Sequence, residues 1–212
     1  MGEARKMMGV CPQHDVLFDL LTPEEHLEIF YEFKGADKTN RKKEIDQLLT
    51  DIGVADKKNN YAYQLSGGNK RKLSVAIALC GNSKFVLLDE PSSGLDIQAR
   101  RQLWEMLRQY RRNRIILLTT HYMDEADILG DRIGIMTGGK MTALGSSMFL
   151  KNRFGMGYVM TLVKSSPALN KKVVPYLRQK LGPEIMKLSE IQGEMTIQIP
   201  RDYTYMFKDF FG

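Results

Sequence analysis

Apolar and polar positions follow clear periods along the chain, and these periods predict most of its secondary structure. The pattern predicts helices in four segments: residues 22–35, 38–53, 66–81 and 97–113. Continuous apolar runs in residues 84–89 and 114–120 are typical of strands that are covered on both faces. A shorter strand is predicted in residues 6–13 and a short helix in residues 123–130. Because strands alternate with helices, the order predicts an α/β fold with a layered, parallel sheet.

The helix predicted in residues 22–35 carries the usual start and stop signals. Thr22 fits the N-cap position, Pro23 fits the first helical position, and Glu25 completes a capping box before a glycine ends the segment. The helix predicted in residues 38–53 is recognised instead by its apolar spacing, which is carried by Ile45, Leu48, Leu49 and Ile52. This second helix is therefore expected to be amphipathic.

The pattern of predicted elements changes towards the end of the sequence. Residues 132–145 predict a hairpin of two strands joined by Gly138 and Gly139. The elements predicted after it are a strand, a helix, two paired strands and the start of a helix, at residues 158–164, 167–182, 185–191, 194–200 and 203–212. We predict a domain boundary near residue 157, with an α/β domain in residues 1–156 and a small, incomplete α+β domain in residues 157–212.

Composition and charge are those of a globular domain. The chain has 212 residues, of which 43% are hydrophobic and 26% charged, and no uncharged apolar stretch approaches the ~20 residues needed to span a bilayer. The two cysteines, Cys11 and Cys80, form no metal-binding spacing, so we expect buried thiols in a reducing compartment. The net charge of +6 comes in short basic runs at residues 41–43, 70–72 and 111–112, which we interpret as solvated helix faces.

Two adjacent carboxylates, Asp89 and Glu90, stand at the end of a predicted buried strand. Ligands of open α/β sheets bind at that edge, and two acids there are costly to desolvate unless a cation or a proton transfer uses them. In nucleotide hydrolysis, Asp89 would hold Mg²⁺ and Glu90 would polarise the attacking water. An acidic turn shaped by Pro91 is the simpler interpretation, but the surrounding VLLDEPSSGLD favours the catalytic one.

Two further polar residues follow predicted strands. His121 comes just after the strand in residues 114–120, so it is expected at the same sheet edge, where an imidazole can donate to a terminal phosphate. Gln13 ends the first strand, and its amide could bind Mg²⁺ or position water, although a polar loop residue explains it equally well. The remaining histidines, His14 and His26, have no such context.

Ser66, Gly67 and Gly68 open the helix predicted in residues 66–81, where backbone N–H groups and the helix dipole favour an anion. We expect a phosphate there. A nucleotide site of this kind also needs a P-loop, and the one near match, GIMTGGKM in residues 134–141, ends in methionine where a Mg²⁺-binding hydroxyl is required. Its glycines join strand to strand, so we interpret it as a hairpin.

Four motifs, CPQ, LSGGNKRKLSVAIALC, VLLDEPSSGLD and TTHYMDEAD, occur together in the order and spacing of an ABC-transporter nucleotide-binding domain. The resemblance covers residues 6 to about 150. It implies an ATPase fold in which a helical signature subdomain adjoins a parallel-sheet core, with ATP and Mg²⁺ as ligands.

The resemblance assigns roles at the sheet edge residue by residue. Asp89 resembles the Walker B aspartate and Glu90 the catalytic base. His121 resembles the switch histidine, and Gln13 the Q-loop glutamine, which would join Asp89 around Mg²⁺. These roles agree with those that the residue types suggest by themselves.

Four more residues resemble parts that face a second domain. Ser66, Gly67 and Gly68 resemble the signature motif, and Asp96 the D-loop aspartate. In the family, two nucleotide-binding domains close head to tail over two ATP molecules, each held between the Walker A motif of one domain and the signature of the other. Ser66 and the glycine amides would therefore face the γ-phosphate of an ATP bound to the opposite domain.

The segments RKLSVAIAL, HYMDEADILGDRIGIM and GSSMFLKNRFGMGYVMTLVK resemble the A subfamily, whose members are large lipid transporters with two such domains in one chain. A regulatory domain follows each nucleotide-binding domain there, and EMTIQIPRDYTYMFKDFF resembles its strand-then-helix portion. The resemblance implies transmembrane domains as partners, a membrane location with this segment on the cytoplasmic face, and lipid as the transported substrate.

The chain contains no Walker A motif, so we interpret it as a fragment of a transporter and expect the isolated chain to bind ATP very weakly and to turn over negligibly. Two alternatives remain. One is a non-catalytic, regulatory fragment that supplies only the signature face to a partner's ATP. The other is a non-transporter ABC ATPase acting on nucleic acid, which the basic charge favours and the absence of aromatic-basic interleaving disfavours. We expect no nucleic acid as a partner.

Overall fold

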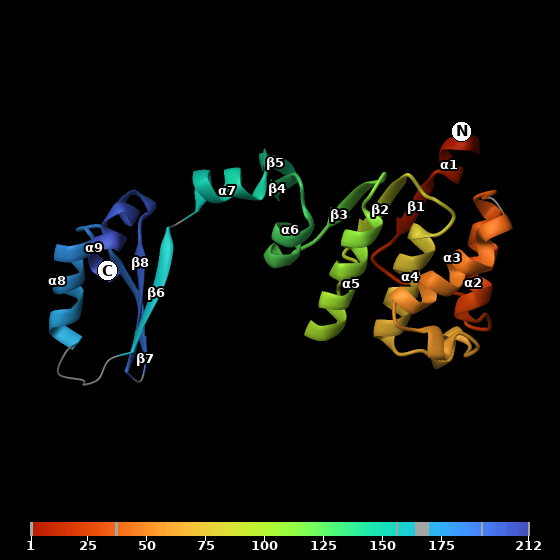
Figure 1. The fold of residues 1–212 in the computed structure, drawn as a ribbon, viewed down its shortest axis with the longest axis horizontal. Helices are drawn as coiled ribbons and strands as arrows, with labels where there is room; N and C mark the ends of the chain where they lie inside the picture. The colour runs from red at the N-terminus through yellow and green to blue at the C-terminus, as the bar shows by residue number, and fades with distance from the viewer. Residues whose placement is uncertain (1, 37, 156, 164–169, 192, 212) are drawn as a thin grey trace. The chain divides into compact units, whose positions relative to one another are not determined.

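The computed structural model describes residues 2–36, 38–155, 157–163, 170–191 and 193–211. The chain divides into two compact units, Met1–Ile133 and Gly134–Gly212. Figure 1 shows their elements in chain order, from red at the N-terminus to blue at the C-terminus. Helices and strands are mixed in both units, which confirms the predicted α/β fold class.

The first unit is built on a parallel sheet with the strand order β1-β2-β3. These strands are Met8–Cys11 (β1), Phe85–Asp89 (β2) and Ile115–Thr119 (β3). Leu88 of the central strand pairs with Cys11 on one side and Leu118 on the other. Because the three strands run in the same direction, their carboxyl ends meet at one edge, as the sequence predicts.

Helices cover one face of this sheet. α4 (Gly67–Leu79) packs against β1 and β2, and α5 (Ile97–Tyr110) packs against α4. The approach of α4 to β1 is closest at Gly9, where a Cβ atom would lie 1.7 Å from the backbone oxygen of Ala78. The single tryptophan, Trp104, is buried on α5, so its fluorescence reports on the first unit.

The prediction that the apolar strands are covered on both faces is wrong for β3 within the described residues. Ile116 and Leu118 pack against the core, whereas Ile115 and Leu117 are 67% and 57% exposed. Successive side chains of a strand point to opposite faces of the sheet. An uninterrupted apolar run therefore identifies the strand without showing which of its faces is covered.

The helical part of the unit is formed by α2 (Pro23–Phe33) and α3 (Arg41–Asp51), which pack against each other and against α4. The predicted capping box is present: Thr22 Oγ1 accepts from the Glu25 N–H at 3.2 Å, and Glu25 Oε2 accepts from the Thr22 N–H at 2.7 Å. The apolar residues predicted for the face of α3 are all buried. The remaining elements of this unit are short helices and 3₁₀ turns at Gly2–Lys6 (α1), Lys38–Asn40, Ala55–Lys57, Ala62–Gln64 and Met123–Leu129 (α6).

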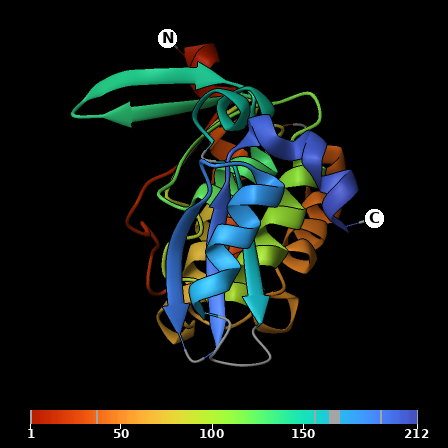
Figure 2. The same ribbon diagram turned by 90° about the vertical axis from the view of Figure 1, so that its left-hand side faces the viewer.

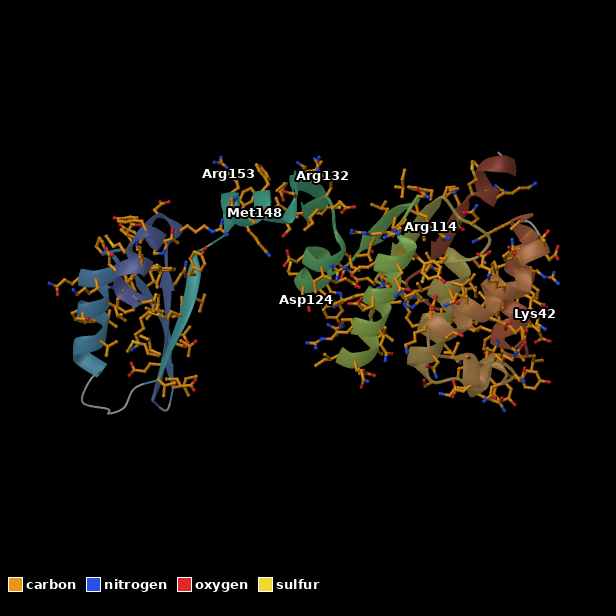
Figure 3. The ribbon with its side chains drawn as sticks, viewed as in Figure 1. Lys42, Arg114, Asp124, Arg132, Met148 and Arg153 are labelled. Carbon is orange, nitrogen blue, oxygen red and sulfur yellow. The ribbon has the colours of Figure 1, made fainter. Side chains whose placement is uncertain are left out.

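The basic runs do not all form solvated faces. Lys42 lies on the outer side of α3 and is exposed, as expected (Figure 3). On α4, however, the side chain of Arg71 is only 4% exposed, and Lys72 is also buried. α4 packs between the sheet and the helices α2, α3 and α5, so every residue from 71 to 79 is buried and no side of the helix there faces water. The interpretation of residues 70–72 as a solvated run is therefore wrong for these two residues.

Both cysteines are buried, as predicted. Burial raises the pKa of the Cys11 thiol to about 11, and it also raises the pKa of Cys80. The thiols are therefore protonated and unreactive at neutral pH in the folded chain.

His26 makes the stability of the first unit sensitive to acid. The ring is fully buried, with Nδ1 at 2.8 Å from Thr22 O and Nε2 accepting from the Phe18 N–H at 2.8 Å, which requires the neutral form. Burial lowers the pKa of His26, so the unfolded chain binds this proton more readily than the folded chain. We expect the stability contribution to be complete above about pH 6.5 and to be lost as pH falls through the lower folded-state pKa.

The measurement is urea unfolding followed by Trp104 fluorescence between pH 7.5 and pH 5.5, which reports on the first unit. His26→Gln cannot titrate, so its free energy of unfolding should fall less steeply with decreasing pH than that of the wild type. Parallel slopes would contradict the assignment to His26, and His14→Gln, at an exposed position, serves as the control.

The second unit contains a hairpin and a small antiparallel sheet. β4 (Ile133–Thr137) and β5 (Lys140–Gly145) form the predicted hairpin through Gly138 and Gly139, both at positive φ, and Figure 2 shows the two strands as opposed arrows. The GIMTGGKM segment is thus a hairpin rather than a P-loop. The sheet has the order β6-β8-β7, and its strands are Tyr158–Val163 (β6), Met186–Ile191 (β7) and Glu194–Ile199 (β8). The helices of this unit are Ser147–Phe154 (α7), Asn170–Leu181 (α8), the 3₁₀ segment Arg201–Met206 and Phe207–Phe211 (α9).

This sheet and α8 enclose a separate apolar core, formed by Leu177, Leu181, Ile185, Met195, Ile197 and Ile199. The predicted strand pairing of residues 185–191 with 194–200 is confirmed as antiparallel. The start of the helix predicted at residue 167 lies outside the described residues. The domain boundary near residue 157 remains a prediction.

Candidate functional site

The carboxyl edge of the sheet gathers the acidic residues predicted there. β2 ends at Asp89, which pairs in register with Thr119 at the end of β3. Thr119 Oγ1 donates a hydrogen bond to Asp89 Oδ1 at 2.5 Å, so one carboxylate oxygen is fixed. The Asp89 side chain is at the exposed edge, where its other oxygen can bind a cation or accept a hydrogen bond from a water molecule.

Glu90 follows in a backbone conformation that is unusual for its residue type. Its φ of 51° lies in the left-handed region, which costs an L-residue on the order of 1 kcal/mol or more. The Glu90 N–H donates to Thr119 O at 3.1 Å and to Thr119 Oγ1 at 3.2 Å. The turn thus redirects the Glu90 side chain from the strand direction towards the segment that follows β3.

The second residue after β3 is His121. Its Nδ1 lies 2.6 Å from Glu90 Oε2, and the imidazole is 60% exposed. The neighbouring Tyr122 ring lies with its centroid 4.0 Å from the His121 ring and under the guanidinium of Arg100 at 3.8 Å. The structure therefore brings Asp89, Glu90 and His121 to one edge, as the topology predicts.

The phosphate seat, defined here as Ser66, Gly67 and Gly68, opens α4. Ser66 Oγ accepts from the Asn69 N–H at 3.4 Å and caps the helix, which leaves its proton able to bond a phosphate oxygen. A Cβ atom at Gly67 would meet nothing within 4 Å, so the space above the first turn is open. This space and the first N–H groups of a long helix suit a phosphate.

Gln13 and Asp96 have definite positions but no structural sign of their predicted roles. Gln13 follows β1 with an exposed side chain, and its backbone oxygen accepts from Arg71 at 3.1 Å. Asp96 Oδ1 accepts from the Ala99 N–H at 2.8 Å and caps α5. A helix-capping role explains Asp96 without any ligand, and the D-loop role remains a prediction.

Comparison with known proteins accords with this arrangement. Residues 1–93 match the family model described as "ABC transporter". The chain is 45% identical over its whole length to the human phospholipid-transporting ATPase ABCA3, and 45% identical over 93% of its length to the rat ATP-binding cassette sub-family A member 2. The chain belongs to the ABC transporter family. It covers 12% and 8% of those two relatives, respectively.

Solved ABC proteins share the fold of this chain. One, described as the ATP-binding subunit of an ABC transporter, is 27% identical with a TM-score of 0.64, over 71% of this chain and 63% of that one. Another is a dimeric ATP-binding cassette in a post-hydrolysis state with ADP and Pi, 24% identical with a TM-score of 0.61, over 68% of this chain and 65% of that one. Among the described residues, no helix is long and apolar enough to cross a membrane.

A Mg²⁺ ion would have few protein ligands among the described residues. The described residues contain no group of three or more histidine, cysteine or acidic side chains that could hold a metal. Mg²⁺ commonly keeps several waters and takes one or two carboxylates together with the phosphates of its substrate. The single accessible Asp89 carboxylate fits that requirement.

Two residues of the candidate site were missed by sequence reasoning. Thr119 orients Asp89 and the Glu90 turn, and the only sequence signal was its place at the end of a strand. Arg71 contacts both loops that follow β1 and β2, although it was assigned to a solvated run. The available signal was the apolar character of α4 on all sides after residue 72, because a charge in a helix with no solvent-facing side needs an internal partner.

Proposed function

We propose that this segment is the ATP-hydrolysing part of an A-subfamily ABC transporter that moves lipid across a membrane. Asp89 holds Mg²⁺, with Gln13 as a further ligand from the loop after β1. Glu90 orients and deprotonates the attacking water, and His121 donates to the γ-phosphate. The proposal rests chiefly on the 2.6 Å contact between His121 Nδ1 and Glu90 Oε2 beside Asp89.

In this proposal each residue has its own step. Mg²⁺ supplies charge neutralisation at the phosphates when it is bound. The Glu90 carboxylate accepts the proton of the attacking water, and its contact with His121 keeps the carboxylate oriented until substrate arrives. His121 then exchanges this contact for a phosphate oxygen, where a donor stabilises the charge of the transition state.

The phosphate seat serves a second nucleotide. Ser66, Gly67 and Gly68 face the γ-phosphate of ATP held by another nucleotide-binding domain, which completes a head-to-tail pair. The open space at Gly67 supports this proposal, because no side chain of the described residues fills it. Transmembrane domains of the same transporter would receive the movement, with this segment on the cytoplasmic face.

The test is His121→Ala in a full-length transporter that contains this segment, assayed for MgATP hydrolysis in lipid vesicles. We expect kcat to fall at least tenfold, because one transition-state hydrogen bond is lost, while nucleotide binding persists. Lys42→Ala is the control, since Lys42 is exposed on the outer side of α3 and far in sequence from the three strand ends. Equal losses in both variants, or none in either, would refute the role of His121.

A further inference from the structure

Arg71 connects the separate parts of the proposed ATPase site. We propose that it is a positioning residue that ties the phosphate seat on α4 to the loop after β1 and to the turn after β2. This inference rests on the proposed function, and it adds a link between the seat, which serves a second domain's nucleotide, and the hydrolytic residues of this domain.

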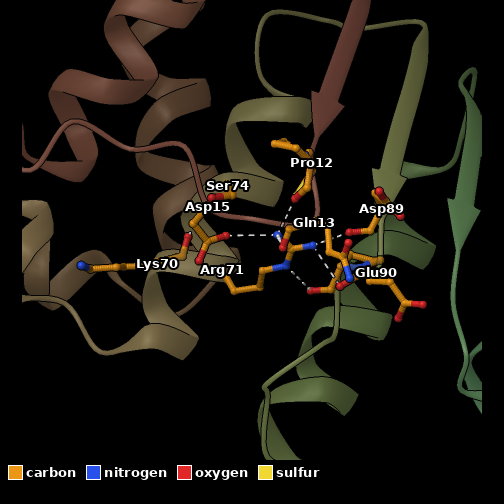
Figure 4. Close-up of polar contacts among 10 residues, drawn as sticks. Pro12, Gln13, Asp15, Lys70, Arg71, Ser74, Asp89 and Glu90 are labelled. Atoms are coloured by element: carbon orange, nitrogen blue, oxygen red, sulfur yellow. Dashed lines mark hydrogen bonds and ion pairs between the residues drawn. The ribbon is translucent and has the colours of Figure 1, made fainter.

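The first set of contacts holds the loop after β1. Arg71 Nη1 donates to Pro12 O at 2.6 Å and to Gln13 O at 3.1 Å, and it lies 3.1 Å from Asp15 Oδ1. Figure 4 shows the guanidinium pointing into this loop, with dashed lines to Pro12 and Asp15. The backbone at Gln13, a proposed Mg²⁺ ligand, is therefore fixed from α4.

The second set holds the turn after β2. Arg71 Nη2 donates to Asp89 O at 2.5 Å and to Glu90 O at 2.9 Å, and Arg71 Nε donates to Pro91 O at 3.2 Å. Three successive carbonyl groups thus converge on one guanidinium. The turn that carries both proposed hydrolytic carboxylates is fixed by the same side chain as the Gln13 loop.

Glu90 is held on both sides of its backbone. Thr119 accepts from its N–H group, and Arg71 donates to its carbonyl group. A residue with φ of 51° persists only when its surroundings over-determine that conformation. Arg71 shares the restraint on the carbonyl side with the Ser93 N–H, which donates to Glu90 O at 3.0 Å, so removal of the guanidinium should loosen the turn and misdirect the Glu90 carboxylate.

The chemistry of the guanidinium explains why the position needs arginine. Five N–H groups in a rigid plane serve six acceptors, of which five are backbone carbonyls and one is the carboxylate of Asp15. Lysine offers three donors from a single point and cannot reach both loops in this way. Because the contacts are to carbonyls, they specify where the two backbones lie.

The position of Arg71 on α4 couples the phosphate seat to the Gln13 loop and the Glu90 turn. Arg71 stands five residues after Ser66, which is about 7.5 Å along a helix axis. α4 is buried on all sides from residue 71 to residue 79 and so moves as a rigid body with its surroundings. A displacement of the phosphate seat therefore moves the guanidinium, and with it the Gln13 loop and the Glu90 turn.

The test compares Arg71→Lys and Arg71→Met with Lys70→Met in the full-length transporter. Lys70 is a matched control, because it is the adjacent residue on α4 and its side chain extends away from the network (Figure 4). We expect Arg71→Lys to lower kcat at least tenfold with KM for ATP changed less than threefold, and Arg71→Met to lower kcat further. Lys70→Met should keep wild-type kcat.

Hydrogen–deuterium exchange separates positioning from general stability. In Arg71→Lys, the amides of residues 13–15 and 89–90 should exchange at least tenfold faster together, while those of β8 in the other unit stay unchanged. In the wild type, MgATP should protect both loops and residues 67–69 in parallel. In Arg71→Lys, MgATP should no longer protect the two loops and residues 67–69 to the same extent.

Three results would overturn the proposal: wild-type kcat in Arg71→Lys, exchange that changes in only one loop or in neither, or loss of folded protein in both Arg71 variants, which would make Arg71 a core residue only. The proposed function fails separately, if the wild-type transporter hydrolyses no ATP. The exchange of the two loops in Arg71→Lys without nucleotide still tests the link in that case.

Discussion

Glu90→Gln should reduce ATP hydrolysis by about 10²-fold or more in a full-length transporter that contains this segment, while ATP binding is retained. Glutamine keeps the size and the hydrogen-bonding shape of the side chain but cannot accept the proton of the attacking water. The left-handed backbone at this residue is as unfavourable for glutamine as for glutamate, so the turn should not change. The measurement is steady-state MgATPase activity beside equilibrium binding of labelled ATP.

The control for this prediction is Glu105→Gln. Glu105 lies on α5 with a side chain that is 71% exposed, and its ion pair with Arg108 at 4.0 Å is of the weak surface kind. The same chemical change there should leave turnover within twofold of the wild type. If Glu90→Gln kept normal turnover, Glu90 would not be the base, and the sheet edge would need another proton acceptor.

Sequence reasoning succeeded where the signal is local or topological. The capping box of α2 and the apolar face of α3 follow from a few residues each, and both are present in the structure. Asp89, Glu90 and His121 meet because each follows a parallel strand, and the strand order places those ends side by side. Their distances, however, depend on the turn at Glu90, and nothing in the sequence reveals its positive φ.

Sequence reasoning failed where burial is decided by distant segments. Arg71 lies between two lysines and has the appearance of a surface charge, but the loops after β1 and β2 supply its partners. These loops are separated from Arg71 by 59 and about 20 positions in sequence. The exposure of one face of β3 could not be predicted either. Alternation of side chains is visible in the sequence only when the two faces of a strand differ in polarity, and both faces of β3 are apolar.

Gly9→Ala should destabilise the first unit by on the order of 3 kcal/mol or more, because an added Cβ meets backbone that cannot step aside. The new methyl group would lie 1.7 Å from Ala78 O and 2.6 Å from Ala78 C, both in the main chain of α4. Gly9 also pairs with Val86 in the sheet, so β1 cannot move away without disturbing its pairing with β2. Relief requires α4 and the sheet to separate, which opens the core that they share.

Urea unfolding of the full chain, followed by Trp104 fluorescence, measures this change in the first unit alone. Gly67→Ala is the matched control, since a Cβ there meets nothing within 4 Å and alanine favours the first turn of a helix; its stability should be unchanged or slightly raised. A loss below 0.5 kcal/mol in Gly9→Ala, on the scale of ordinary surface substitutions, would show that α4 does not approach β1 this closely. A large loss in Gly9→Ala alone would establish the contact that sets the distance between β1, which leads to Gln13, and α4, which carries the phosphate seat and Arg71.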